Sequence, residues 1–202
     1  GIVYKKRHQF ESAIAYFKDG REVYRKARDT SGVAKSNHML GKTYYEYGKY
    51  DSAIACYCSN MTLRNKQLDE KIIRKSIHEL GHIYMERGDA QQAMNSFREC
   101  LSVNINMKDS IGIAQMYNDI GGAYITVGKY DSAATFCYRA LAVSERIGDK
   151  EGTATAALEI GAIYFRQNKD EEAVRCTKRA ATLYDEIDNT RGVIKALINL
   201  VN

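Results

Sequence analysis

The chain has 202 residues, of which 45% are hydrophobic and 27% charged, and its formal net charge is +5. This composition is typical of a folded globular protein, and it excludes a disordered chain. No stretch approaches the roughly 18 uninterrupted apolar residues of a membrane span, so no membrane segment is expected. The sequence lacks proline and tryptophan, which argues against β-sandwiches and barrels and favours an all-α fold.

The predicted elements follow a period of 40 residues, marked by Gly41, Gly81, Gly121 and Gly161. A tyrosine stands three residues after each of these glycines, and an alanine follows nine residues after each tyrosine. Apolar residues recur at helical spacing on both sides of a turn within each period. The pattern therefore predicts five helical hairpins, over residues 1–40, 41–80, 81–120, 121–160 and 161–200.

Each period also carries its own helix stop and start signals. Glycines 48, 88 and 128 are expected to end the first helix of their hairpins, with His8 and Asn168 in the equivalent places. Aspartates 29, 69, 109 and 149 mark the joint that precedes the next hairpin. The repeated glycine and alanine lack bulk, so the two helices of a hairpin are expected to cross closely at these positions.

The combination of Leu-Gly-x-x-Tyr with Ala-x-x-x-aromatic, as in Ala53 to Tyr57 and Ala93 to Phe97, resembles the tetratricopeptide repeat. The period of 40 is similar to the long repeats of LGN/Pins-type adaptors and of bacterial Rap-like regulators. The resemblance implies a right-handed superhelical solenoid of antiparallel hairpins over residues 1–202, whose first helices line a concave groove. Residue 1 and residue 202 both fall inside a predicted first helix, so we expect the chain to be an excerpt of a longer protein.

The phase of the repeat identifies candidate peptide-binding residues on the first helices. These positions vary between repeats whereas the packing positions do not, as expected of side chains that serve a ligand, although a merely solvated face is the alternative. The candidates are Lys35, His38, Lys42, Tyr45, Lys75, His78, Glu79, His82, Asn118, Asp119, Ile125, Glu159, Phe165 and Arg166.

Charge is unevenly distributed along the chain. Residues 1–40 carry nine Lys and Arg against four Asp and Glu. This excess predicts a protein or peptide partner that is acidic where it meets the N-terminal repeats. Nucleic acid is not favoured as a partner, because the basic residues lack interleaved stacking aromatics.

Residues 78–82 read His-Glu-Leu-Gly-His, which matches the zinc-protease signature. Leu80 and Gly81 belong to the repeat, and the extended signature would require a histidine where Gly88 stands. We therefore expect no catalytic residues, no cofactor and no dedicated metal ligands. Adventitious metal binding by His78 and His82, with or without His38, is the alternative.

Five cysteines, at positions 56, 58, 100, 137 and 176, form an odd number without Cys-x-x-Cys spacing. They predict neither a disulfide framework nor a zinc ribbon, and they fit small packing residues in a reducing, cytoplasmic compartment.

Two functions fit the sequence. The first is a non-catalytic scaffold or adaptor that binds a peptide segment of a partner in its groove. The alternative is a peptide-sensing module of a bacterial transcriptional or signalling regulator. The oligomeric state is left open by the sequence.

Overall fold

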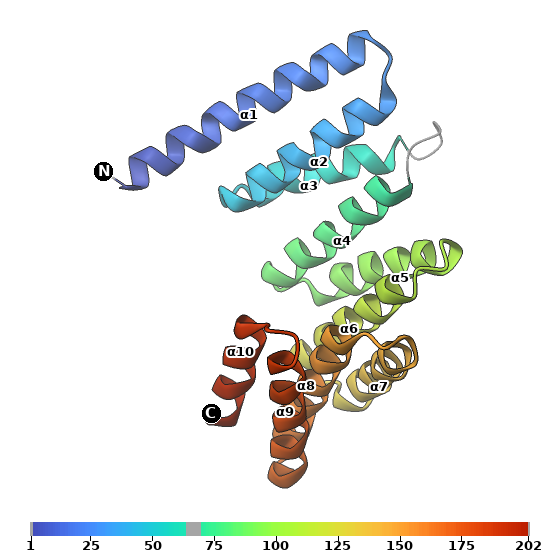
Figure 1. Cartoon of the computed structure of the whole chain (residues 1–202). Coiled ribbons are helices and arrows are strands. Elements are labelled where there is room, and N and C mark those ends of the chain that lie inside the picture. Colours follow the sequence, from blue (N-terminus) through green and yellow to red (C-terminus); the bar gives the residue numbers. More distant parts are fainter. Residues whose placement is uncertain (1, 64–69, 202) are drawn as a thin grey trace. The chain divides into compact units, whose positions relative to one another are not determined.

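The computed structural model describes residues 2–63 and 70–201, and it places side chains for residues 8–63 and 70–200. These residues contain ten α-helices and no β-strand (Figure 1). The helices form two compact units, residues 1–89 and residues 90–202. The all-helical fold predicted from the sequence is confirmed. None of the helices in the described ranges combines the length and the apolar content that crossing a bilayer requires.

The first unit contains four helices, each packed against the next in the chain. They are α1 (Ile2–Lys26), α2 (Thr30–Glu46), α3 (Tyr50–Met61) and α4 (Glu70–Glu86). Helices α2 and α4 also contact each other, so the first helices of two successive hairpins lie side by side. The candidate side chains of this unit therefore share one pair of neighbouring helices.

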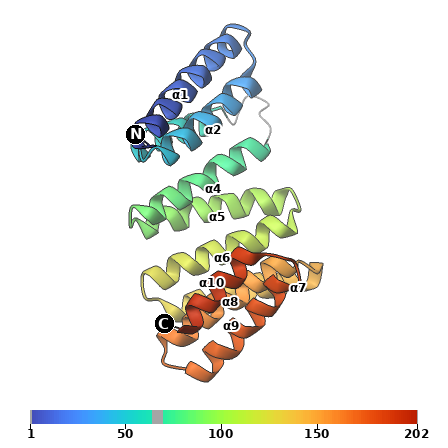
Figure 2. The ribbon, with the colours of Figure 1, turned by 60° about the vertical axis from the view of Figure 1, so that its left-hand side comes forward.

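The second unit contains six helices with the same packing order (Figure 2). They are α5 (Ala90–Asn106), α6 (Ser110–Thr126), α7 (Tyr130–Ile147), α8 (Lys150–Arg166), α9 (Asp170–Asp185) and α10 (Thr190–Val201). Helix α8 contacts α6 on one side and α10 on the other. The candidate residues of this unit thus lie on α6 and α8, two adjacent first helices.

The helix starts repeat with the period of the sequence. Helices α2, α4, α6, α8 and α10 begin at residues 30, 70, 110, 150 and 190. Asp29, Asp109 and Asp149 cap three of these helices, because each carboxylate accepts a hydrogen bond from the backbone N–H three residues later at 2.9–3.0 Å. Asp69, the fourth predicted joint, lies outside the described residues.

The predicted turn positions are confirmed with one exception. Gly48, Gly88 and Gly128 have φ values of 77°, 79° and 73°, and Asn168 adopts the same left-handed conformation at 56°. His8 does not end a helix, so that prediction is wrong: α1 runs unbroken from Ile2 to Lys26. The stretch around His8 contains neither glycine nor asparagine, the residues that enter the left-handed region at low cost, and a continuous helix satisfies its backbone instead.

The helices of a hairpin are in close contact at the repeated glycine. A Cβ atom added to Gly41 would lie 2.7 Å from the ring of Tyr57, and one added to Gly121 would lie 2.5 Å from Sγ of Cys137. Tyr57 and Cys137 are completely buried. The glycine is therefore a packing device in these hairpins, as the repeat predicts.

Candidate functional site

Helix α2 carries four candidate residues, and three of them, Lys35, Lys42 and Tyr45, differ in how far they are exposed to solvent. Lys35 and Lys42 are exposed and Tyr45 is half-buried. The Tyr45 hydroxyl donates a hydrogen bond to Glu86 of α4. This bond is the main reason why the pKa of Tyr45 rises to about 12, with desolvation as the next cause. Tyr45 consequently ties α2 to α4, and the two lysines are the more accessible side chains of the helix.

His38 of α2 contacts residues of both α3 and α4. Its Nδ1 is 3.5 Å from Oγ of Ser76, and its ring centroid is 5.5 Å from that of Tyr57. Burial lowers the pKa of His38, the nearby charge of Glu79 opposes this shift, and Lys75 and Lys42 add to it. Burial and the two lysines thus disfavour protonation of His38, and one nearby carboxylate favours it.

A buried polar network below His38 was missed by the sequence analysis. Asn60 donates to the carbonyl of Ala34 and to Oγ of Ser76, both at 3.0 Å, and it accepts from Nδ2 of Asn37 at 3.1 Å. Arg21 of α1 donates to the Asn37 amide oxygen at 3.1 Å. The signal in the sequence is that Asn60 stands where later repeats have Cys100 and alanine.

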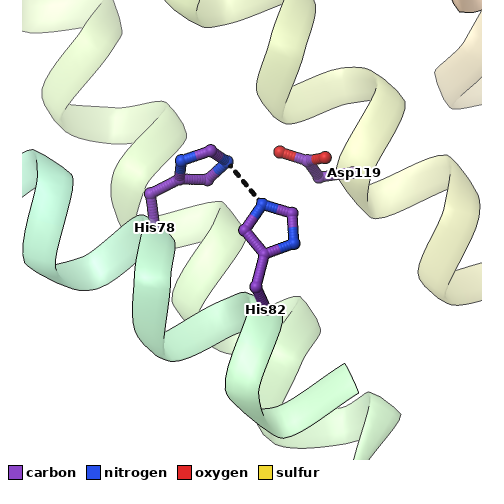
Figure 3. A group of neighbouring side chains, drawn as sticks. All are labelled: His78, His82 and Asp119. Atoms are coloured by element: carbon purple, nitrogen blue, oxygen red, sulfur yellow. Dashed lines mark hydrogen bonds between the residues drawn. The ribbon is translucent and has the colours of Figure 1, made fainter. Parts of the chain in front are cut away.

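The α4 candidates include the two histidines of the protease-like motif. His78 and His82 lie one helical turn apart, and their Nε2 atoms are 3.0 Å from each other (Figure 3). Both rings are half-buried, as is Glu79, whereas Lys75 is exposed. The helix therefore brings the two imidazoles together through their outer nitrogens.

The α6 candidates are less accessible than a groove position requires. Asn118 is only 7% exposed, and its amide oxygen has no hydrogen-bond partner within the described ranges. Asp119 and Ile125 are half-buried, and Ile125 packs against the cluster that contains Ala133 and Ile163. Of the three, Asp119 is the polar side chain that keeps access to solvent.

The α8 candidates border a pocket. Phe165 is 45% exposed and Arg166 is also exposed, while Glu159 accepts a hydrogen bond from Lys195 of α10 at 3.5 Å. Phe165 and Arg166 line a cavity of about 360 Å³ between α8, α9 and α10. Its other lining residues are Gly161, Ala162, Asp170, Ala173, Val174, Thr177, Asn199 and Leu200.

The pocket has both apolar and polar lining groups. Its apolar lining can take an aliphatic or aromatic side chain, and the Arg166 guanidinium and the Asn199 amide can bind a carboxylate or a peptide carbonyl. The sequence singled out Phe165 and Arg166 as candidates but did not predict the pocket that they line, because the small residues at its floor were assigned to helix packing alone.

Stacked, capped helix pairs with variable polar side chains on their first helices define a helical-repeat interaction scaffold, a class that typically has no catalytic activity. A family model described as Tetratricopeptide repeat matches residues 1–66 and 112–186. A second model with the same description matches residues 75–104. The chain belongs to the tetratricopeptide repeat family.

Several solved structures share this fold. BtubC (BKLC) from P. vanneervenii superposes with a TM-score of 0.78 at 16% identity, over 95% of this chain and 81% of that protein. A STAND protein with a tetratricopeptide repeat sensor from Pyrococcus horikoshii gives 0.82 at 18% identity, over 98% and 30%. A Rap protein complexed with Competence and Sporulation Factor gives 0.75 at 16% identity, over 96% and 54%. No curated protein sequence matches the chain significantly.

Proposed function

We propose that this chain is a non-catalytic adaptor that binds an extended peptide segment of a partner protein along the first helices of its repeats. The observation that carries the proposal is the pocket lined by Phe165, Arg166 and Asn199, which places an aromatic ring, a guanidinium and an amide around an apolar floor. One side chain and one carboxylate or carbonyl of a peptide would occupy it together.

The first unit would contribute positive charge. Lys42 and Lys75 both act electrostatically on His38, and Lys35 is exposed on the same helix as Lys42. An acidic segment of the partner would be attracted to these lysines, and its association would slow as salt increases. We further propose that the chain works in the cytoplasm, where its five free cysteines would remain reduced.

A binding experiment on the full chain tests the adaptor function. Peptides selected from a random display library would be measured by fluorescence anisotropy against the parent protein and the single variants Phe165→Ala and Arg166→Ala. Each substitution is expected to weaken binding by about 1 to 3 kcal/mol, the scale of a truncated anchor at an interface. The matched controls are Arg139→Ala and Lys178→Ala, which remove exposed charges from the second helices α7 and α9.

The outcome distinguishes the first-helix surface from the second-helix surface. Equal affinity of the Phe165 and Arg166 variants with the parent, together with loss of binding in the two controls, would contradict the proposal. A library that yields no peptide binder would contradict it as well.

Peptide sensing is the second candidate function. Two proteins of the same fold favour it, namely the Rap protein complexed with Competence and Sporulation Factor and the STAND protein with a tetratricopeptide repeat sensor. A sensor must change conformation between its free and bound states. Small-angle scattering of the chain with and without a selected peptide separates the two functions, because a simple adaptor shows the same scattering curve in both states.

A further inference from the structure

The two histidines of α4 form an arrangement that peptide binding does not explain. His78 and His82 are one turn apart, so both side chains project from the same face of the helix. Their Nε2 atoms are 3.0 Å apart, and the ring centroids are 4.5 Å apart at an interplanar angle of 68° (Figure 3). This contact is a hydrogen bond, in which one Nε2 donates its proton and the other accepts it. When both rings carry their proton on Nδ1 instead, both Nε2 atoms present a lone pair at the same place.

The separation of the two nitrogens matches the bite of a metal chelate. Imidazole nitrogens bind Zn²⁺ at about 2.0 to 2.1 Å. Two nitrogens 3.0 Å apart at that bond length subtend an angle of about 94° at the metal, close to the right angle of octahedral coordination. A tetrahedral angle requires about 3.3 Å, which a rotation of either ring by a few degrees supplies.

We propose that His78 and His82 chelate one divalent late transition metal ion, with Zn²⁺ as the representative, through their Nε2 atoms. Imidazole is a preferred donor for Zn²⁺, Ni²⁺ and Cu²⁺, whereas Mg²⁺ and Ca²⁺ require oxygen ligands. The site goes beyond the adaptor function, since it does not depend on a peptide partner.

The expectation drawn from the sequence was that the chain has no dedicated metal ligands, and the side-chain geometry is the reason to depart from it. The repeat accounts for Leu80 and Gly81, but it does not dictate a histidine at position 82, where other repeats have Lys42 and Gly122. Nor does it require the two rings to meet through their outer nitrogens. These two features are the ones that a chelate needs.

Metal chelation by the two histidines does not by itself imply hydrolysis, because the glutamate between them has other charged and polar neighbours. A zinc protease uses the glutamate after the first histidine as a base toward metal-bound water. Glu79 instead lies close enough to His38 and Tyr57 to shift the pKa of both side chains.

Titration of the metal-free full chain with ZnCl₂ tests the proposal. Calorimetry is expected to show one site, and ¹⁵N NMR is expected to show that the Nε2 signals of His78 and His82 move with the first equivalent. His78→Ala and His82→Ala should each weaken Zn²⁺ binding by about tenfold or more, the scale of losing a metal-site group. MgCl₂ should produce neither heat nor shifts.

Two controls separate this site from other zinc ligands of the chain. His8→Ala removes an exposed histidine of α1, and Cys58→Ser removes an exposed thiol of α3. Both variants should bind Zn²⁺ like the parent. The NMR shifts are read on the parent protein, so they report on the site even if a histidine variant unfolds.

The proposal is overturned by either of two results. The first is the absence of any shift of the His78 and His82 Nε2 signals at one equivalent of Zn²⁺. The second is a site that persists in both histidine variants but disappears in Cys58→Ser, since the ion would then be held by the thiol.

Discussion

A single added methyl group can test the close helix crossing at Gly121. Helix α6 contains two adjacent glycines, Gly121 and Gly122, in very different surroundings. An ideal Cβ at Gly121 would lie 2.5 Å from Sγ of the completely buried Cys137 of α7, whereas a Cβ at Gly122 would have nothing within 4 Å. The variants Gly121→Ala and Gly122→Ala therefore make the same chemical change one residue apart.

The free energies of unfolding of the two variants should differ only by the steric strain that the added methyl group causes at position 121. Alanine in place of a helical glycine stabilises by about 1 kcal/mol, and this gain is common to both. Non-bonded heavy atoms prefer separations of about 3.5 to 4.0 Å, so the new methyl at position 121 is more than about 1 Å too close to the sulfur. Overpacking of this kind costs about 1 to 3 kcal/mol. We expect Gly122→Ala to be more stable than Gly121→Ala by that amount.

Urea unfolding followed by circular dichroism measures this difference. Hydrogen exchange of the α6 and α7 amides adds a readout confined to the unit that contains the crossing. A difference of about 1 kcal/mol corresponds to roughly 2 to 4 °C in the thermal midpoint of a chain of this size.

A double-mutant cycle with Cys137→Ala identifies the contact itself. The shortened side chain leaves room for the new methyl, so Gly121→Ala should cost less when it is combined with Cys137→Ala, with a coupling energy of about 1 kcal/mol. Equal stability of the Gly121 and Gly122 variants would refute the reasoning, because the helices would then not be in close contact at the repeated glycine.

Two further predictions concern the backbone and a buried histidine. Lys108 adopts φ of 55° after α5 and is exposed, whereas Gly148 has the same place after α7. Lys108→Gly should therefore raise the free energy of unfolding by about 0.5 to 1 kcal/mol, measured by urea unfolding, and an unchanged or lower value would contradict this. Burial lowers the pKa of His38 from 6.5, so the unfolded chain takes up its proton first as pH falls. Stability should accordingly decrease below about pH 6.5, and His38→Gln should flatten that part of the profile; the same slope in both proteins would exclude His38 as the cause.

Much of the backbone could be predicted because the same helix start and stop signals recur in several repeats of the sequence. Capping aspartates, turn glycines and crossing glycines recur at the same phase, and each has a local physical reason that one hairpin suffices to reveal. The error at His8 arose where the periodic signal was weakest, since nothing but phase indicated a turn there. A helix without a breaker continues, and α1 does so.

The candidate site was predicted less completely, because solvent access depends on neighbours that phase does not describe. Asn118 and His38 occupy the same position of the repeat. Asn118 is buried, and its amide oxygen has no hydrogen-bond partner among the described residues, whereas His38 is half-buried beside Ser76. The difference follows from what the adjacent helix provides at each place. Repeat phase gives the direction of a side chain, and the size and polarity of its neighbours decide what it can reach.

The buried side chains of the first unit differ in polarity from those at the same repeat positions elsewhere, although the helix arrangement is the same. Asn60 is completely buried, and its side-chain amide forms hydrogen bonds with Ala34, Asn37 and Ser76. At the same repeat position the second unit has Cys100, Ala140 and Ala180, none of which carries an amide. A fully paired buried network adds little net stability, but it penalises any shift of α2, α3 and α4 that would leave an amide unpaired. The network therefore fixes the relative placement of α2 and α4, the two helices that carry the lysines and the histidine pair.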